Sequence, residues 1–294
     1  MAGRRGKPEH SMVGALPLFA CASRRLLVGF LLAAGALTLH AASAQADDLA
    51  MIRQRGTLIV GVKTDYPPFG FRSPAGEIEG IEPDLAADVA NSLGVKLELV
   101  PVVASNRIQL LEQGRIDLII ATMNATRERK AEIDIVRPAY YASGYNVMVP
   151  RAMKLTSWAD LKGKKVCGIE DAYFNYQATM NFEFQVVAFA STEDALTALQ
   201  QGHCAGLLYD DAAIEGSMQQ LEWRDYTMPL ASQEVQPWSL AVRKDQPQLA
   251  DYLSGVVRRW VKDGTILNLE TKYHIRHSSF AEEAHQKASG PAGN

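Results

Sequence analysis

The chain has 294 residues, 47% of them hydrophobic and 21% charged, which is enough for one or two globular domains with real cores. Residues 1–46 carry five basic residues and one acidic residue, so the remainder has 25 basic and 32 acidic residues and a formal charge of −7. This acidic balance argues against nucleic acid as a partner.

Residues 1–46 have the pattern of an export signal peptide. Arg24 and Arg25 precede an apolar run at residues 26–39, and Ala44-Gln45-Ala46 is a small-residue cleavage site. We therefore expect export and cleavage after Ala46. An uncleaved membrane anchor is the alternative, although the apolar run is short for a transmembrane span. The two arginines also resemble a twin-arginine signal, but we predict the general export route.

The first part of the exported chain predicts strands that alternate with helices. Asp65–Phe71 contains two prolines, which forbid a helix and a strand ladder, so we expect a rigid loop that presents aromatic rings. A helix opens at Glu82, with proline in its first turn, and ends at Gly94. The remaining predicted elements are strands at 58–62, 95–100 and 116–120 and a helix at 108–111. This order is typical of a parallel sheet covered by helices.

The segment Ala121–Arg129 follows the last of these strands and leads into a helix. Thr126 is a good N-cap for a helix that begins at Arg127. In open α/β sheets, ligands bind where a strand ends beside a helix N-terminus. The guanidinium of Arg129, one turn into the helix, is suited to hold a carboxylate through two hydrogen bonds. The alternative is a solvated surface arginine.

The pattern then starts afresh and predicts a second β-α-β-α-β unit. We expect an extended run at 147–150, a short helix at 158–163, strands at 165–169, 185–189, 207–208 and 238–242, and helices at 174–180, 192–201, after 209–211, and over 249–273 with a break at 263–264. Residues 276–294 are polar and small and predict a loose tail. Two similar units in tandem suggest two lobes with a ligand cleft between them.

Two cysteines remain after removal of the leader, which contains Cys21. Cys167 and Cys204 each begin an apolar, strand-like run, so a disulfide between neighbouring strands is the expectation for an exported protein. Two buried free thiols are the alternative. The spacing fits no zinc motif, and we expect no metal and no cofactor.

Four stretches and a characteristic ending, spread over residues 56–275, resemble one family. The stretches are DYPPFGF at 65–71, GIEPDLAADVANSLGV at 80–95, GRIDLIIATMNATRER at 114–129 and WADLKGKKV at 158–166, and the ending runs from Trp260 to Tyr273. In this order they are similar to the periplasmic solute-binding proteins of polar amino-acid ABC transporters, the family 3 extracellular solute-binding proteins.

The resemblance implies the α/β, two-lobed periplasmic-binding-protein fold. Each lobe would be a mostly parallel sheet flanked by helices, and two hinge crossings would join the lobes. Lobe 1 would hold residues 47–148 and 238–275, lobe 2 residues 149–237, and a flexible tail residues 276–294. The resemblance also implies a monomer in the periplasm, an amino acid as ligand, and an inner-membrane ABC permease with its ATPase as partner.

The resemblance further assigns roles to single residues. Tyr66 matches the aromatic residue that covers the ligand's side chain, and packing within the loop is the alternative. Ala121, Thr122 and Asn124 match the turn that meets the α-amino and α-carboxylate groups, although Asn124 replaces a more usual Ser or Thr. Arg129 matches the clamp for the carboxylate.

Asp210 matches the carboxylate that holds the ligand's α-ammonium group. Its neighbour Asp211 would then be the surface member or the N-cap, and the reverse assignment is the alternative.

One stretch departs from the family pattern. A Gly-Ser/Thr-Thr turn usually follows the strand found here at 166–169, but this chain has Asp171-Ala172-Tyr173. Tyr173 would close over the ligand, and the change puts the identity of the ligand in question. Arg107, before the second helix, would face the ligand's side chain and favour an acidic or polar one.

Two other functions stay open on the sequence. Some relatives with this fold are dehydratases of small cyclic carboxylic acids, and others are sensory modules. The acid–base candidates near the expected cleft are Glu170, Asp171 and His203, and none has an evident partner. The sequence contains no HExxH, no G-x-S-x-G and no phosphate-binding glycine loop. We therefore expect a binding protein and not an enzyme.

Overall fold

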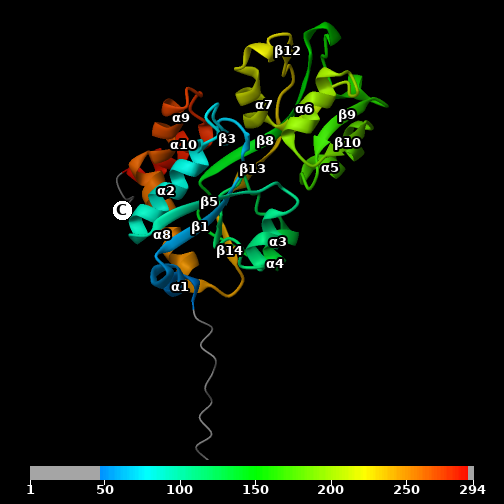
Figure 1. The fold of residues 1–294 in the computed structure, drawn as a ribbon. Helices are drawn as coiled ribbons and strands as arrows, with labels where there is room; N and C mark the ends of the chain where they lie inside the picture. Colours follow the sequence, from blue (N-terminus) through cyan, green and yellow to red (C-terminus); the bar gives the residue numbers. More distant parts are fainter. Residues whose placement is uncertain (1–46, 291–294) are drawn as a thin grey trace, which may run out of the picture. The chain divides into compact units, whose positions relative to one another are not determined.

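We analysed a computed structural model of the chain, which describes residues 47–290 (Figure 1). The predicted signal peptide and its cleavage after Ala46 lie outside the described residues. Within this range no helix is both long enough and apolar enough to cross a membrane.

The first sheet confirms the β-α-β-α-β order of the first unit. Its strands, in spatial order, are β5 (Lys96–Pro101), β1 (Thr57–Val62), β6 (Leu118–Ile119), β14 (Ala241–Arg243) and β7 (Ile133–Ile135). Strand β1 pairs in parallel with β5 and β6, whereas β14 runs antiparallel to β6 and β7. The carboxyl ends of β1 and β6 therefore meet at one edge of the sheet.

The second sheet confirms the second repeat of this order. Its strands, in spatial order, are β10 (Gln185–Phe189), β9 (Lys165–Ile169), β11 (Leu207–Asp210), β8 (Tyr141–Pro150) and β12 (Tyr226–Thr227), and β13 (Gln233–Trp238) also pairs with β8. Strand β9 is parallel to β10 and β11, and β8 is antiparallel to its partners.

Some helices begin at a residue whose side chain caps them, and some end at a glycine in the left-handed conformation. The α-helices are α1 (Asp48–Arg55), α2 (Ile81–Leu93), α3 (Arg107–Glu112), α4 (Arg127–Glu132), α5 (Phe174–Phe182), α6 (Thr192–Gln200), α7 (Asp211–Met218), α8 (Pro247–Asp263), α9 (Thr265–Lys272) and α10 (Ser279–Ser289). Short 3₁₀ helices are η1 (Arg151–Met153), η2 (Trp158–Leu161) and η3 (Leu221–Trp223). Gly264, with φ 69°, separates α8 from α9 at the predicted break, because glycine adopts this left-handed conformation without strain.

The proline-containing segment differs from the predicted loop. Strands β2 (Asp65–Tyr66) and β3 (Gly70–Arg72) pair antiparallel, and β4 (Ile78–Glu79) pairs with β3. The two prolines occupy the connection between β2 and β3, where a missing N–H costs no ladder bond. Gly70 is required there, because a Cβ would lie 2.2 Å from the carbonyl oxygen of Lys63.

The chain passes between the sheets along β8 and β13, which pair with each other in the middle of Figure 1. The sequence predicted one strand at 238–242, but the structure has β13, which ends at Trp238, and a separate β14, which starts at Ala241. The prediction missed this division because Trp238 to Val242 is one apolar run, although its two halves serve different sheets. The chain thus enters the second sheet at Tyr141 and returns to the first at Ala241, whereas the predicted lobe boundaries lie at 148/149 and 237/238.

The expected loose tail is wrong for most of residues 276–290. Ser278 caps α10 by accepting the N–H of Ala281, and Ala281 is buried. A nitrogen of the His285 ring lies 2.9 Å from the carbonyl oxygen of Val261 in α8. The prediction was wrong because the segment is mostly polar, and a helix needs only one narrow apolar face to pack on α8.

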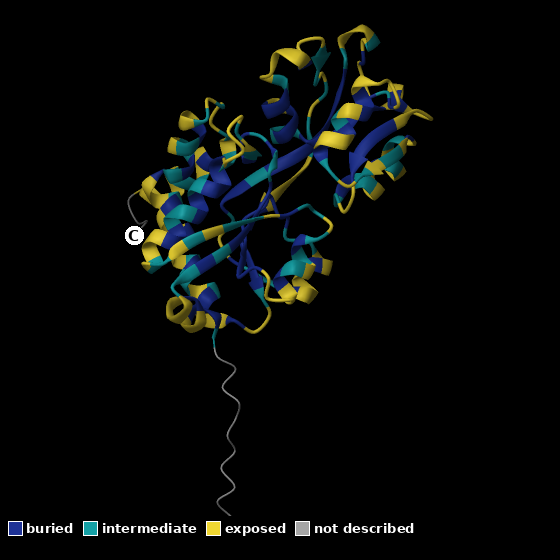
Figure 2. Cartoon of the chain, in the orientation of Figure 1, coloured by how far each residue is buried: buried dark blue, intermediate teal, exposed yellow. Residues whose placement is uncertain are grey.

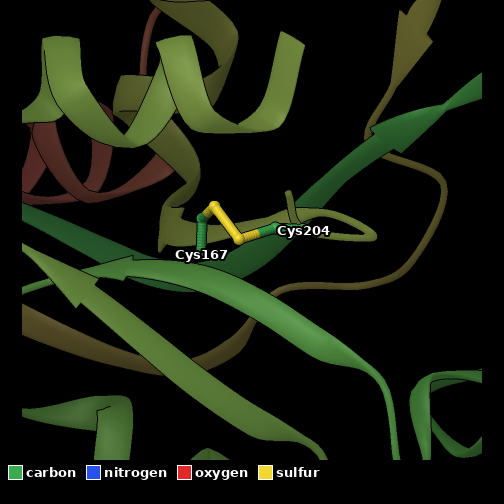
Figure 3. Close-up of a disulfide and its surroundings, with 2 residues drawn as sticks. All are labelled: Cys167 and Cys204. Atoms are coloured by element: carbon green, nitrogen blue, oxygen red, sulfur yellow. A yellow bond between two sulfur atoms is a disulfide. The ribbon is translucent and has the colours of Figure 1, made fainter. Parts of the chain in front are cut away.

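The core is formed by the strands and by the inner faces of the helices. Figure 2 shows β8 mostly dark blue, whereas the edge strand β5 is teal and yellow, as are the outer faces of many helices. The largest fully buried side chains are Trp238 and Trp260. Cys167 of β9 and Cys204, in the loop before β11, form the disulfide that the sequence suggested (Figure 3).

Candidate functional site

A small cavity of about 20 Å³ lies between the two α/β units. From the first unit it is lined by Lys63, Ala104, Arg107, Thr122, Asn124 and Arg129, and from the second by Ile169, Asp171, Ala172, Tyr173, Phe174, Tyr209 and Asp210. Most of these residues follow the carboxyl ends of β1, β6, β9 and β11, the edge at which α/β sheets bind ligands. The volume holds about one water molecule.

Arg129 reaches the cavity from the first turn of α4. The N–H of Arg129 donates to the Thr126 hydroxyl at 3.3 Å, which is the cap that the sequence predicted. The side chain is buried, so the surface alternative is wrong. Its Nη2 donates to both the backbone oxygen and Oδ2 of Asp171, each at 2.9 Å. A carboxylate of the second unit thus already occupies one side of the guanidinium.

The turn that precedes α4 is held by a buried glutamate. Thr122 has a left-handed backbone, with φ 47°, which is rare for a β-branched residue. Its N–H donates to Oε1 of Glu82 in α2 at 2.6 Å, and the hydroxyl of Tyr140 donates to the same oxygen. Burial raises the pKa of Glu82 to about 7. Glu82 therefore positions the turn without lining the cavity.

The same turn places a free amide at the cavity. Asn124 is buried and forms an isolated β-bridge with Trp238. Its Nδ2 has no hydrogen-bond partner among the described residues. The amide is thus available to an acceptor within the cavity.

Asp210 and Asp211 face different surroundings. Asp210 ends β11, lines the cavity and leaves Oδ1 without a hydrogen-bond partner in the described part of the chain. Asp211 instead accepts from its neighbour's N–H at Ala212 and from the hydroxyl of Ser143. Burial, together with the nearby charge of Asp211, raises the pKa of Asp210 to about 7. Asp210 is therefore the member of the pair that faces the cavity.

The departure from the family pattern lies directly on the cavity. Asp171 has a left-handed backbone, with φ 58°, and its side chain is 48% exposed. Tyr173 lines the cavity, and its hydroxyl donates to the carbonyl oxygen of Glu234 on β13 at 2.9 Å. The altered turn of the second unit therefore contacts Arg129 of the first unit through Asp171. It contacts β13 through Tyr173.

Two predicted site residues lie behind the lining. Ala121 is fully buried, and its carbonyl oxygen accepts from Nη1 of Arg107. Tyr66 is also fully buried, with its ring centroid 5.2 Å from that of Tyr209, and its hydroxyl has no hydrogen-bond partner within residues 47–290. Neither residue lines the cavity; Tyr66 packs against Tyr209, and its hydroxyl lies near the carboxyl of Asp210.

Three residues of the site or its support were not predicted from the sequence: Lys63, Tyr209 and Glu82. Lys63 is 1% exposed, and its Nζ lies 3.1 Å from Oδ1 of Asp65 and 3.3 Å from the hydroxyl of Tyr209. Its place directly after β1 was the available signal, because the cavity gathers residues at strand ends. Tyr209, like its neighbour Asp210, lies at the end of a strand, and this position was the available signal. The sequence around Glu82 did not distinguish it from an exposed acidic residue at the start of a helix.

A cavity between two α/β units, lined by buried groups of both charges and crossed by an ion pair, defines a binding protein for a small charged molecule. Comparisons with known proteins agree. The profile described as "Bacterial extracellular solute-binding proteins, family 3" matches residues 58–276. The chain belongs to this family.

Among individual relatives, the ABC transporter glutamine-binding protein GlnH of Bacillus subtilis (strain 168) is 32% identical over 224 residues, which cover 74% of this chain and 81% of that protein. A crystal structure of the P235GK mutant of ArgBP from T. maritima superimposes with a TM-score of 0.72 at 28% identity, covering 77% of this chain and 98% of the other.

A second solved structure bears on catalysis. The ancestral amino acid-binding protein AncCDT-1, described as a precursor of cyclohexadienyl dehydratase, superimposes with a TM-score of 0.69 at 29% identity. It covers 77% of this chain and 99% of its own. These similarities establish the two-lobed fold of the solute-binding proteins for this chain.

Proposed function

We propose that the protein binds an amino acid between its two lobes and delivers it to an ABC-type import permease with its ATPase. One observation carries the proposal: buried groups of opposite charge, Arg129 and Asp210, line the same cavity, and Asp210 Oδ1 has no partner among the described residues. A zwitterion supplies the complementary pair, a carboxylate for Arg129 and an ammonium group for Asp210. The relatives named as amino-acid-binding proteins of ABC transporters support the same ligand class and partner.

Binding requires the lobes to separate, because the cavity is smaller than an amino acid. The ligand carboxylate would replace Asp171 on Arg129, and closure would then bring Asp210 and Tyr173 over the ligand. Charge pairs strengthen as water leaves the site. The ligand favours the closed form only to the extent that it binds this form more tightly than the open one.

The proposal includes export to the periplasm with cleavage after Ala46, and action as a monomer. The predicted signal peptide and the family's description as extracellular proteins support the export. A monomer agrees with a site that one chain completes.

Catalysis on a small cyclic carboxylic acid is the second candidate. It is favoured by the similarity to AncCDT-1 and by Asp210, because a buried carboxyl with a pKa of about 7 is suited to proton transfer. We place binding first because Asp210 has no second acid or base beside it with an evident role in catalysis.

The test is a thermal-shift and calorimetric screen of residues 47–294 against the common amino acids and small cyclic acids. A ligand at 100-fold above its Kd should add about 2.7 kcal/mol of stability. Recovery of the ligand unchanged after incubation supports binding without turnover, and conversion of a cyclic acid supports the enzyme. The absence of any shift with amino acids would contradict the proposed function.

Arg129→Ala tests the carboxylate clamp. Removing one partner of a buried charge pair costs ~2–5 kcal/mol, so the Kd measured by calorimetry should rise by roughly 30-fold to several thousandfold. Arg127→Ala is the matched control, because Arg127 is exposed on the same helix. An unchanged affinity in the Arg129 variant would overturn this role.

A further inference from the structure

Arg107 is a buried cation without a counter-charge in the structure. It opens α3, is 3% exposed and lines the cavity. Within residues 47–290 the single hydrogen bond of its side chain runs from Nη1 to the carbonyl oxygen of Ala121, and the buried Nε has no partner. A guanidinium presents five N–H donors, so most of the donor capacity of Arg107 is unused.

The carboxylates near Arg107 are engaged elsewhere. Asp65 is paired with Lys63, and Asp171 is paired with Arg129. Glu82 accepts the Thr122 N–H and the Tyr140 hydroxyl, and burial raises its pKa to about 7. Asp210 lines the same cavity but would form an ion pair with the ligand's ammonium group. An unpaired buried charge is costly, and this arrangement leaves Arg107 unpaired.

Lys63 adds a second cation beside Arg107. Burial lowers the pKa of Lys63, but the nearby Tyr209 and Asp65 more than offset this, so the amine stays charged. The ammonium group has three N–H donors, and two are directed at Asp65 and Tyr209. The remaining donor is available to a group in the cavity.

We infer that the protein selects an amino acid with an anionic side chain, whose second carboxylate binds Arg107 with Lys63 beside it. This inference rests on the proposed function, in which Arg129 and Asp210 take the α-carboxylate and the α-ammonium group. Once those two groups are paired, the displaced Asp171 is weakened as a partner by solvent, because its side chain is 48% exposed. Arg107 is then the buried cation that an anionic side chain of the ligand neutralises. A cationic side chain would meet two buried like charges, so arginine is excluded although ArgBP is a structural neighbour.

The acidic amino acids and their amides test this inference, because each acid has nearly the same shape as its amide. Calorimetry of residues 47–294 should give L-glutamate or L-aspartate a Kd roughly tenfold or more below that of L-glutamine or L-asparagine, since a charge-assisted bond is stronger than a neutral one. L-arginine should not bind. Tighter binding of an amide or of arginine would overturn the inference and leave the proposed function standing.

Substitutions at Arg107 then assign the selectivity. Arg107→Met should abolish the preference for acid over amide while the affinity for the amide changes little. Arg107→Lys, which keeps the charge, should retain much of the preference, and Arg115→Met is the control at an exposed arginine beyond the same helix.

Two outcomes at Arg107 would overturn the inference. An equal loss of affinity for acid and amide would place Arg107 on the α-carboxylate, and an unchanged ratio would remove it from the site. If Arg107→Met does not fold, the ratio of the Kd for the amide to the Kd for the acid in the unmodified protein and in Arg107→Lys still tests the inference. Binding of no amino acid at all would instead contradict the proposed function itself.

Discussion

Neighbouring aspartates at the end of β11 have opposite roles. Asp210 projects into the cavity, whereas Asp211 accepts the Ser143 hydroxyl and the Ala212 N–H. The charge of Asp211 nevertheless affects the site, because it acts with burial to raise the pKa of Asp210 to about 7. Asp210 therefore changes its charge near neutral pH, in contrast to an ordinary aspartate.

This pKa predicts a pH-dependent affinity. A ligand ammonium group favours ionised Asp210, so binding lowers its pKa and releases a proton wherever Asp210 is protonated in the free protein. Affinity should be highest near pH 8, where Asp210 is ionised and the ligand's ammonium group is still charged. It should fall as the pH decreases, with a Kd about tenfold higher at pH 6 than at pH 8. Calorimetry across pH 5.5–8.5 measures both the Kd and the proton release.

Two variants separate Asp210 from the other groups around it. Its charged and titratable surroundings are Asp211, Tyr66, Lys63 and Arg107. Asp211→Asn should keep the pH dependence and move it to lower pH, because one like charge is removed. Asp210→Asn should bind weakly and lose the slope. A slope that persists in Asp210→Asn would assign the titration to another group, of which Glu82 is the first candidate.

Among the elements, α10 lies beyond the matched family region, which ends at residue 276. It packs on α8 through Ala281, and a nitrogen of the His285 ring lies 2.9 Å from the carbonyl oxygen of Val261. Ser278, its N-cap, donates its backbone N–H to Glu270 of α9 at 3.1 Å. The helix therefore covers the C-terminal helices of the first lobe.

Ala281→Glu tests the packing of α10. A carboxylate at this buried position is removed from water, so we expect a loss of about 2 kcal/mol and a Tm lower by about 4–8 °C. Differential scanning calorimetry of residues 47–294 measures the change. Gln286→Glu adds the same charge at an exposed position of α10 and should leave the Tm nearly unchanged. Equal Tm values for the two variants would mean that α10 does not pack on the domain in solution.

At the scale of the whole molecule, the ion pair between Arg129 and Asp171 joins the two lobes. The same guanidinium is the proposed clamp for the ligand carboxylate, so Asp171 competes with the ligand while it holds the lobes together. Because the Asp171 side chain is 48% exposed, solvent weakens this pair, and ~0.2–1 kcal/mol is the appropriate magnitude.

Asp171→Ala should therefore release the lobes and strengthen binding. We expect a larger radius of gyration in small-angle scattering without ligand and a Kd lower by up to about fivefold, because a fraction of the site is no longer blocked. Glu170→Ala is the control at the exposed neighbouring residue. Weaker binding in Asp171→Ala would show that Asp171 helps to hold the ligand.

Features that depend on local patterns were predictable from the amino-acid sequence. The strands at 165–169 and 185–189 have the predicted bounds, and Thr126 caps the helix that carries Arg129. The order of these elements was enough to predict two α/β units and a site at the strand ends. Hydrophobic periodicity and capping act over a few residues, so they are visible in the chain alone.

The packing of distant elements determines which side chains share the cavity. Lys63, Arg107 and Asp171 are far apart in the chain, and their contacts depend on how the two lobes meet. The choice between Asp210 and Asp211 depended on packing, because Asp210 ends β11 whereas Asp211 begins α7, and their side chains meet different neighbours. The docking of α10 likewise depended on the surface of α8. Sequence patterns determine elements, whereas the approach of distant elements determines which buried charges meet and therefore which ligand the site selects.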